Sequence, residues 1–280
     1  MRLSVITPTF NLIDEGREAT FRQAVQSVRD QTHDAIEHLV IDGGSKDGTV
    51  DMLETMKAEG AISDFVSQPD TGIYDAMNRG GRMATGDYIL YLNSDDYYHR
   101  KEGMADVAAA AEKSRPGFIC SPIVMLDEPP YTFRVSRYFF RVLAVMPFGH
   151  PGMAVRKDVF DSFGGFDETF RISADYNLIA RLITAGVSSE VLEDAFASFR
   201  PGGVSEDRAA RDAERVTVLK GVFGKFAEIP DEDWRWYVAR RRFPTRVLLR
   251  MLIAPGLPGR MRGIAALHLL RNVRPGKVRT

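Results

Sequence analysis

Two adjacent carboxylates follow a short apolar segment in the first hundred residues. Asn93, Asp95 and Asp96 come directly after DYILYL (87–92). Neighbouring carboxylates repel each other, and a shared cation stabilises them. Their oxygens suit Mg²⁺ and Mn²⁺, and a diphosphate can supply further ligands. The motif predicts Mn²⁺ or Mg²⁺ on Asp95 and Asp96. The alternative is a solvated turn, because Asn, Ser and Asp favour turns.

Polar residues also follow three other apolar segments. The segments 3–7, 37–42 and 64–67 run into TPTFN, DGGSKDGT and QPDTG, respectively. Each segment has the length and apolar character of a buried strand. In open α/β sheets, ligands bind outside the carboxyl ends of the strands. We therefore expect the four polar clusters to form one site.

Helical patterns separate these expected strands. Apolar residues recur at helical spacing within 21–28, 50–56 and 76–83. Strands that alternate with helices predict βαβ units and a mostly parallel, doubly wound α/β sheet. Later in the chain we expect a strand at 118–126, a mixed, partly antiparallel segment at 131–155 and a helix at 175–186.

A further carboxylate lies at the start of this last helix. Asp175 precedes Leu178 and Ile179 of the apolar stripe by three and four positions. That spacing directs its side chain toward the body of the domain. The alternative is an acidic residue favoured by the helix dipole, with Ser173 as the N-cap.

Four long runs resemble a known family. They are SVITPTFN, EHLVIDGGSKDGT, QPDTGIYDAMNRGGRMATGDYILYLNSDD and HPGMAVRKDVFDSFGGFDETFRISADYNLIARL, in this order. Between residues 3 and about 205 the chain resembles glycosyltransferase family 2, whose members have the GT-A fold. It looks closest to the members that assemble bacterial polysaccharides and glycolipids. One departure is Asn93, where many relatives have Asp.

The resemblance implies a Rossmann-like nucleotide-binding half that holds a nucleotide sugar. Asp42 would accept a hydrogen bond from the base, which favours UDP over GDP or dTDP. The other interpretation of Asp42 is a turn aspartate before two glycines. Arg79 would face the diphosphate. The residues expected to bind the donor are Thr7, Pro8, Thr9, Asn11, Asp42, Asp70, Arg79, Asn93 and Asp95.

The resemblance also implies that Asp175 is the catalytic base of an inverting transfer to an acceptor hydroxyl. Ala174 stands where relatives commonly have a second acidic residue, so a supporting carboxylate is missing. His150 matches a segment near the acceptor, although a lone histidine is commonly structural. Arg200 and residues 202–205 would form a lid over the donor, with an ordinary turn as the alternative.

Composition limits the remaining possibilities. The only cysteine, Cys120, excludes an internal disulfide and a CxxC-type zinc site, as expected for a reducing compartment. The N-terminus has no apolar stretch of signal-peptide type, and no apolar run reaches about 18 residues. We expect a cytoplasmic protein without a transmembrane helix.

The net charge of −1 conceals an asymmetric distribution. Residues 235–280 contain 12 of the 37 Lys and Arg residues and none of the 38 acidic residues. Apolar runs at 247–253 and 264–270 separate the arginines, as in amphipathic segments that bind anionic membranes. We expect a catalytic domain at 1–230 and a C-terminal helical extension at 231–280, a basic amphipathic tail that associates with the cytoplasmic face of the inner membrane. A helical pair packed on the domain is the alternative, and nucleic acid is disfavoured as a partner.

The expected function is metal-dependent transfer of a sugar to a glycan or lipid-linked acceptor in cell-surface polysaccharide or glycolipid synthesis. One rival, a sugar nucleotidyltransferase, would carry a Gly-rich basic loop after the first strand, where this chain has TPTFN. The other rival, a non-catalytic membrane scaffold, would not need the acidic residues at 42, 95, 96 and 175.

Overall fold

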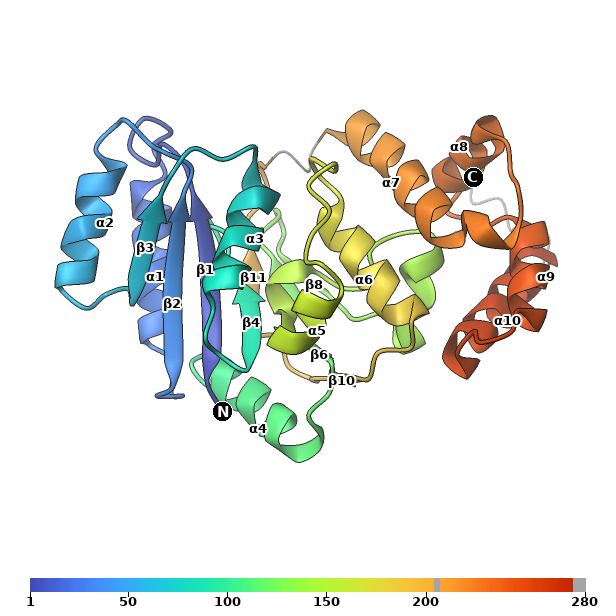
Figure 1. Ribbon diagram of the computed structural model, residues 1–280, viewed down its shortest axis with the longest axis horizontal. Coiled ribbons are helices and arrows are strands. Elements are labelled where there is room, and N and C mark those ends of the chain that lie inside the picture. The colour runs from blue at the N-terminus through green and yellow to red at the C-terminus, as the bar shows by residue number, and fades with distance from the viewer. Residues whose placement is uncertain (204–206, 274–280) are drawn as a thin grey trace. The chain divides into compact units, whose positions relative to one another are not determined.

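The computed structural model describes residues 1–203 and 207–273 (Figure 1). The chain forms two compact units, and the first comprises Met1–Val135, Phe148–Arg171 and Ser188–Gly202. The second comprises the other residues, so it includes the helix that carries Asp175 as well as the C-terminal helices. The second unit thus contains residues on both sides of the domain boundary expected at residue 230. That boundary stays a prediction. Parts of the expected lid (204–205) and tail (274–280) lie outside the described residues.

A seven-stranded, mostly parallel sheet forms the centre of the first unit. Its order is β10-β6-β9-β4-β1-β2-β3. Only β9 runs antiparallel to its two neighbours, and the other pairings are parallel. This arrangement confirms the α/β class. The strands are β1 (Leu3–Thr9), β2 (Ile36–Asp42), β3 (Asp64–Ser67), β4 (Tyr88–Tyr91), β6 (Phe118–Cys120), β9 (Met153–Arg156) and β10 (Ser189–Val191).

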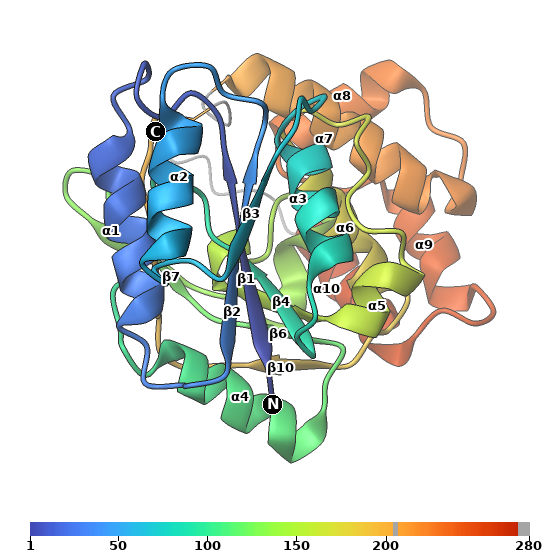
Figure 2. The ribbon, with the colours of Figure 1, turned by 60° about the vertical axis from the view of Figure 1, so that its left-hand side comes forward.

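Helices cover both faces of this sheet. Leu3 and Val5 of β1 share a core with Ala24 of α1 and Val107 of α4. On the opposite face α3 packs against β1 and β2, and Figure 2 shows α1 and α2 on one side of the strands with α3 on the other. The helices of this unit are α1 (Glu18–Arg29), α2 (Thr49–Ala58), α3 (Ile73–Met83), α4 (Gly103–Ser114) and α5 (Lys157–Ser162).

The strand expected at 118–126 is two strands in different sheets. Pro122 has no N–H to donate to a ladder, so the strand breaks there. β6 stays in the large sheet, and β7 (Ile123–Met125) joins a four-stranded sheet of order β5-β11-β7-β8. The other members of that sheet are β5 (Tyr97–Tyr98), β8 (Tyr131–Phe133) and β11 (Ala197–Phe199).

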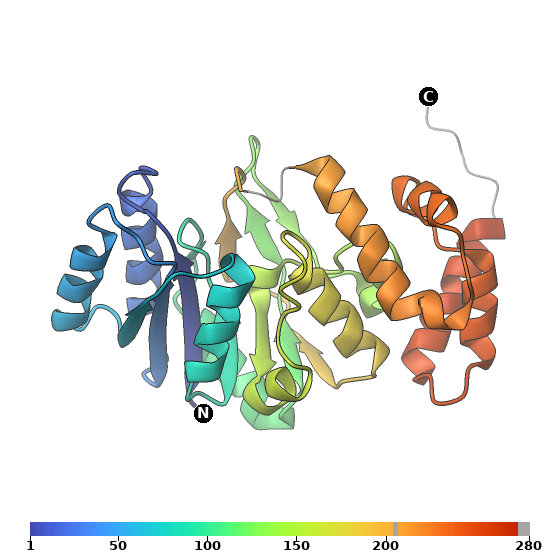
Figure 3. The ribbon, with the colours of Figure 1, turned by 45° about the horizontal axis from the view of Figure 1, so that its top comes forward.

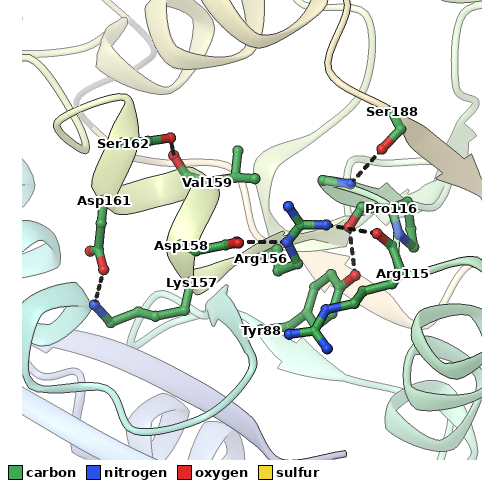
Figure 4. A network of polar contacts seen from close by, with 11 residues as sticks. Tyr88, Arg115, Pro116, Arg156, Lys157, Asp158, Val159, Asp161, Ser162 and Ser188 are labelled. Carbon is green, nitrogen blue, oxygen red and sulfur yellow. Dashed lines mark hydrogen bonds and ion pairs between the residues drawn. The ribbon is translucent and has the colours of Figure 1, made fainter.

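A polar network lies at the end of the large sheet where β4 begins (Figure 4). Tyr88 Oη donates to the carbonyl oxygen of Pro116 at 2.5 Å. The Arg156 guanidinium donates to the carbonyl oxygen of Arg115 and to the Asp158 carboxylate. These contacts fix the end of the sheet that lies away from Asn93–Asp96.

The second unit is helical in its described residues. Phe223, Trp234 and Phe243 form an aromatic core, with ring centroids 5.2 and 5.6 Å apart. α9 and α10 pack against each other (orange to red in Figure 3), and Leu248 of α9 and Ile264 of α10 are buried. The described elements of the second unit are η1 (Arg137–Leu143), α6 (Ala174–Thr184), α7 (Arg208–Phe223), η4 (Gly224–Phe226), α8 (Asp231–Ala239), α9 (Thr245–Ile253) and α10 (Gly259–Val273).

The basic tail expected at 231–280 contains α8, α9 and α10 in its described residues. The apolar run 247–253 lies in α9, and the run 264–270 lies in α10. Each helix buries one apolar stripe inside the unit, so the two runs are parts of a folded core. No helix among the described residues is long and apolar enough to cross a membrane.

Candidate functional site

The carboxyl ends of β1, β2 and β3 meet in register at one edge of the sheet. Thr9 pairs with Asp42, and Asp42 pairs with Ser67. The fully buried Asp42 carboxylate accepts hydrogen bonds from the hydroxyls of Thr9, Ser45 and Ser67 at 3.3, 2.5 and 2.7 Å. It also accepts from the backbone N–H groups of Gly44 and Ser45 at 3.0 and 2.8 Å. Asp42 therefore determines the shape of the loop that follows β2.

The first strand is longer than the sequence indicated. β1 continues through Thr9, so the side chains of Thr7, Pro8 and Thr9 are buried within the sheet. The Thr7 hydroxyl lies 3.0 Å from Nε2 of the buried His38, whose pKa burial lowers to about 4. These three expected donor contacts are strand residues, and the chain first emerges from the sheet at Phe10.

Asn11 joins the loops after β1 and β2. Its backbone has a φ of +44°, a left-handed conformation that Asn tolerates better than most residues. Its N–H donates to Ser45 Oγ at 2.7 Å, and its Oδ1 accepts from the N–H of Lys46. Asp47 accepts from the N–H groups of Ile13 and Asp14 in the same region. Asn11 is thus part of a stiff pair of loops.

Sequence reasoning missed Phe10, which lies beside Asp70. The Phe10 side chain is 51% exposed. A Cβ atom at Gly43 would lie 2.7 Å from Asp70 Oδ2 and 3.1 Å from Phe10 Cδ2, so both side chains close over this glycine. Burial raises the pKa of Asp70, against the effect of a hydrogen bond from the N–H of Gly72. The available signal was a large aromatic residue among polar ones at a strand end.

Arg79 of α3 contacts the loop after β3. Its guanidinium donates to the carbonyl oxygens of Gln68 and Pro69 at 3.2 and 3.3 Å and lies 3.6 Å from Asp75. Its side chain is largely buried by these contacts. Arg79 therefore supports the loop that carries Asp70.

The acidic motif after β4 is partly enclosed. Asp96 is fully buried, and burial, together with the Asp95 charge, raises its pKa well above the usual value. Asp96 accepts hydrogen bonds from the N–H of Arg200 at 2.8 Å and from Asn93 Nδ2 at 3.3 Å. The Arg200 guanidinium donates to the carbonyl oxygen of Asp95 and to Gln23.

A cation suits this set of oxygens. Asn93 Oδ1 is buried, and no described residue donates a hydrogen bond to it. Because Asp96 is fully buried beside the Asp95 carboxylate, its negative charge is unfavourable there without a cation. Asp95, Asp96 and Asn93 offer the hard oxygen atoms that Mg²⁺ and Mn²⁺ prefer. Among the described residues, no cluster of three or more His, Cys, Asp or Glu side chains is arranged to hold a metal ion.

His150 lies beside the acidic motif. It belongs to the short η2 helix (His150–Gly152) that leads into β9, and its Nε2 lies 3.4 Å from Asn93 Nδ2. Burial lowers the pKa of His150 to about 4, which favours the neutral ring. Because β9 runs antiparallel to β4, this segment reaches the edge of the sheet that carries Asn93.

Asp175 belongs to the second unit. It is the second residue of α6 and is partly buried, while the following residue, Tyr176, donates from its hydroxyl to the carbonyl oxygen of Val142 at 2.6 Å. Ser173 occupies the N-cap position but makes no capping hydrogen bond through its side chain. Ser173 is therefore at the expected N-cap position, but its hydroxyl does not cap the helix.

Known proteins share this arrangement. Residues 4–166 match the family described as Glycosyl transferase family 2. An uncharacterized glycosyltransferase of Mycobacterium tuberculosis (strain ATCC 25618 / H37Rv) is 35% identical over 187 residues, covering 64% of this chain and 68% of its own. A PGL/p-HBAD biosynthesis glycosyltransferase of Mycobacterium bovis (strain BCG / Pasteur 1173P2) is 28% identical over 179 residues, with the same coverage.

Solved structures extend the likeness to nearly the whole chain. Residues 1–349 of S. aureus TarS, solved in complex with UDP-GlcNAc, give a TM-score of 0.64 at 17% identity, and the match covers 97% of this chain and 89% of that one. The mannosyltransferase PcManGT from Pyrobaculum calidifontis, in complex with GDP-Man and Mn²⁺, has a TM-score of 0.59 at 16% identity, with 98% and 88% covered. These likenesses show the GT-A fold. A sheet whose polar strand ends form one edge, and a match over more than half of the chain, place this protein in glycosyl transferase family 2 as a glycosyltransferase with the GT-A fold.

Proposed function

We propose that the chain moves a sugar from a nucleotide sugar to an acceptor hydroxyl with inversion at the anomeric carbon, and that Asp175 is the base. The observation that carries this proposal is the meeting of four polar strand ends at one edge of the sheet. Such an edge is where open α/β sheets bind nucleotides. Neither a scaffold nor a nucleotidyltransferase is favoured for a member of this family.

The donor site we propose uses the loops after β1, β2 and β3. The exposed Phe10 ring offers a surface for base stacking. Asp42 shapes its loop, and Asp70 provides a carboxylate beside that ring. UDP is the favoured nucleotide, and the UDP-GlcNAc complex of TarS supports a nucleotide-sugar ligand for this fold. GDP stays the alternative, because PcManGT was solved with GDP-Man.

Asp95, Asp96 and Asn93 would hold Mn²⁺ or Mg²⁺ together with oxygens of the diphosphate. A divalent cation bound there neutralises negative charge on the leaving nucleotide diphosphate. Arg200 fixes the backbone of this motif, and Arg79 keeps the neighbouring loop in place. The Mn²⁺ in the PcManGT complex supports use of a divalent cation by this fold.

Asp175 takes the proton of the acceptor hydroxyl as the oxygen attacks the anomeric carbon. The bond from the anomeric carbon to the diphosphate oxygen breaks as the new glycosidic bond forms. A carboxylate placed for this transfer contributes roughly 10²–10⁴-fold to the rate. His150 would lie on the acceptor side, where its neutral ring can donate or accept a hydrogen bond.

The test is release of the nucleotide from UDP-, GDP- and dTDP-sugars by the purified chain, with Mn²⁺, Mg²⁺ or a chelator. We expect release from one nucleotide class and its loss with the chelator. Asp175→Asn should reduce turnover at least about 100-fold while nucleotide affinity stays within about twofold. Asp212→Asn, which removes an exposed carboxylate of α7, is the control. Normal turnover by Asp175→Asn would falsify the assignment of the base.

We propose an anionic membrane surface on the cytoplasmic face of the inner membrane as a further partner. α9 and α10 bury one apolar stripe each, yet Leu249, Ile253, Leu267 and Leu270 stay 47–79% exposed. These side chains lie opposite the buried stripes at helical spacing. Arg246 and Arg250 follow the same exposed side of α9. Exposed leucines flanked by arginines suit a membrane interface.

A membrane partner points to the class of acceptor. An enzyme held at the membrane surface meets lipid-linked hydroxyls more often than free ones. The similarity to a PGL/p-HBAD biosynthesis glycosyltransferase supports a glycolipid or cell-surface polysaccharide product.

A further inference from the structure

The start of α6 is held by a carboxylate from a neighbouring helix. Glu214 of α7 accepts two hydrogen bonds at one oxygen, Oε2. The donors are the backbone N–H groups of Ile172 at 2.9 Å and Ser173 at 2.7 Å. Both helices belong to the second unit and pack against each other, so this contact is internal to it.

This carboxylate holds the two residues that lead into α6. A capping side chain accepts from the N–H of the second or third helical residue, and here the N–H of Tyr176 donates to Oδ1 of Asp175 at 2.7 Å, while Ser173 does not cap the helix. Glu214 instead satisfies the N–H groups of Ile172 and Ser173, which precede the helix. The negative charge of Glu214 also interacts favourably with the positive end of the helix dipole. One side chain therefore fixes the chain where it enters α6.

The fixed residues immediately precede Asp175. Only Ala174 separates Ser173 from Asp175, and Ala174 is completely buried. A rotation of the backbone at 172–173 would therefore be transmitted to the direction of the Asp175 side chain. The fully buried methyl group of Ala174 also shows that position 174 is closely packed, so a carboxylate there would need the surrounding side chains to move.

Glu214 is itself well anchored. α7 buries Val216, Val218 and Leu219, and its N-cap residue Asp207 accepts at its side chain a hydrogen bond from the N–H of Ala210 at 3.0 Å. Glu214 therefore projects from a helix whose position is set by its own core contacts. A firmly held partner can restrict the first turn of α6 to one conformation.

We propose that Glu214 is a positioning residue for Asp175. Its carboxylate fixes the backbone of 172–173 directly before Asp175 and acts on Asp175 through that backbone. This inference rests on the proposed role of Asp175 as the base. It predicts that Glu214 affects the chemical step while leaving the binding of the donor unchanged.

The experiment compares three variants by nucleotide release from the donor selected in the screen above. Glu214→Ala should lower kcat about 10- to 100-fold, with the donor KM within about twofold, because misplacement of a catalytic group by about 1 Å costs up to about 100-fold. Glu214→Gln keeps an oxygen that can accept both N–H groups and should restore most of kcat. Asp212→Ala, on the same helix, should keep the kcat of the unchanged chain.

A shorter side chain keeps the test decisive if Glu214→Ala does not fold. Glu214→Asp retains the charge but lacks one methylene, and we expect it to melt within a few degrees of the unchanged chain with a several-fold lower kcat. An unchanged kcat in the folded Ala or Asp variant, beside an inactive Asp175→Asn, overturns the proposal for Glu214 alone. Full activity of Asp175→Asn instead overturns the proposed base.

Discussion

Single residues at the sheet edge divide into those that shape the site and those that are available to a ligand. A carboxylate offers about four lone-pair positions, and five donors already contact that of Asp42. Phe10 and Asp70, in contrast, remain partly exposed. The sequence located the polar clusters correctly, but it could not show which side chains neighbouring strands would enclose. Only the register of β1, β2 and β3 determines that.

We predict that Asp42→Asn acts mainly through the loop after β2. An amide has one acceptor oxygen where the carboxylate has two, so it cannot accept from all five donors, and the variant should lose about 1–3 kcal/mol of unfolding free energy. Donor affinity should fall about tenfold because the loop is less well formed. Chemical denaturation and calorimetric titration with UDP measure the two effects, and Asp51→Asn on exposed α2 surface is the control. Weakened binding at unchanged stability would assign Asp42 to direct contact with the base.

At the scale of elements, local patterns predicted most strands and helices. β3 occupies the expected residues 64–67, and α6 covers most of 175–186. The errors occur where contacts between distant segments decide the outcome. β1 continues through Pro8 because its ladder with β2 extends to Thr9 and Asp42, whereas its ladder with β4 ends at Ile6. The segment 118–126 divides between two sheets at Pro122. Neither result follows from local periodicity.

The packing of α3 on the sheet provides a prediction at this scale. A Cβ atom at Gly80 would collide with Ile6 Cγ2 and lie 3.0 Å from Ile41 Cγ1. Gly80→Ala should therefore separate α3 from β1 and β2 and cost about 1–3 kcal/mol. Gly221→Ala in α7, where no heavy atom lies within 4 Å, should be neutral or stabilise by up to about 1 kcal/mol. Thermal unfolding measures both, and equal melting temperatures would contradict the close contact.

At the scale of the whole molecule, the charge asymmetry was evident in the sequence, whereas the two compact units were not. Composition changes near residue 230, but α6 and η1 join the second unit through contacts with helices far away in the chain. His268 of α10, for example, stacks on Phe140 of η1 with ring centroids 4.0 Å apart. Such long-range contacts leave no mark in a local composition profile.

The charge asymmetry and the exposed leucines predict binding to anionic vesicles. The purified chain should sediment with vesicles that contain phosphatidylglycerol, and not with vesicles of phosphatidylcholine alone. Ile253→Asp together with Leu270→Asp should abolish sedimentation, because both side chains are more than half exposed. Val191→Asp, at an exposed position of β10, is the matched control. Equal sedimentation of all variants would exclude α9 and α10 as the binding surface.

The reversed direction of β9 has a consequence for how such an enzyme can diversify. Because β9 is antiparallel to β4, the end of β4 and the start of β9 lie next to each other on the side of the sheet that carries Asn93. Between β8 and β9, however, η1 carries the buried Phe139, Val142 and Leu143, so insertions are tolerated only in the exposed turn around Arg134 that precedes it. A change of length in that turn leaves the paired ends of β1 and β2, which carry Thr9 and Asp42, where they are.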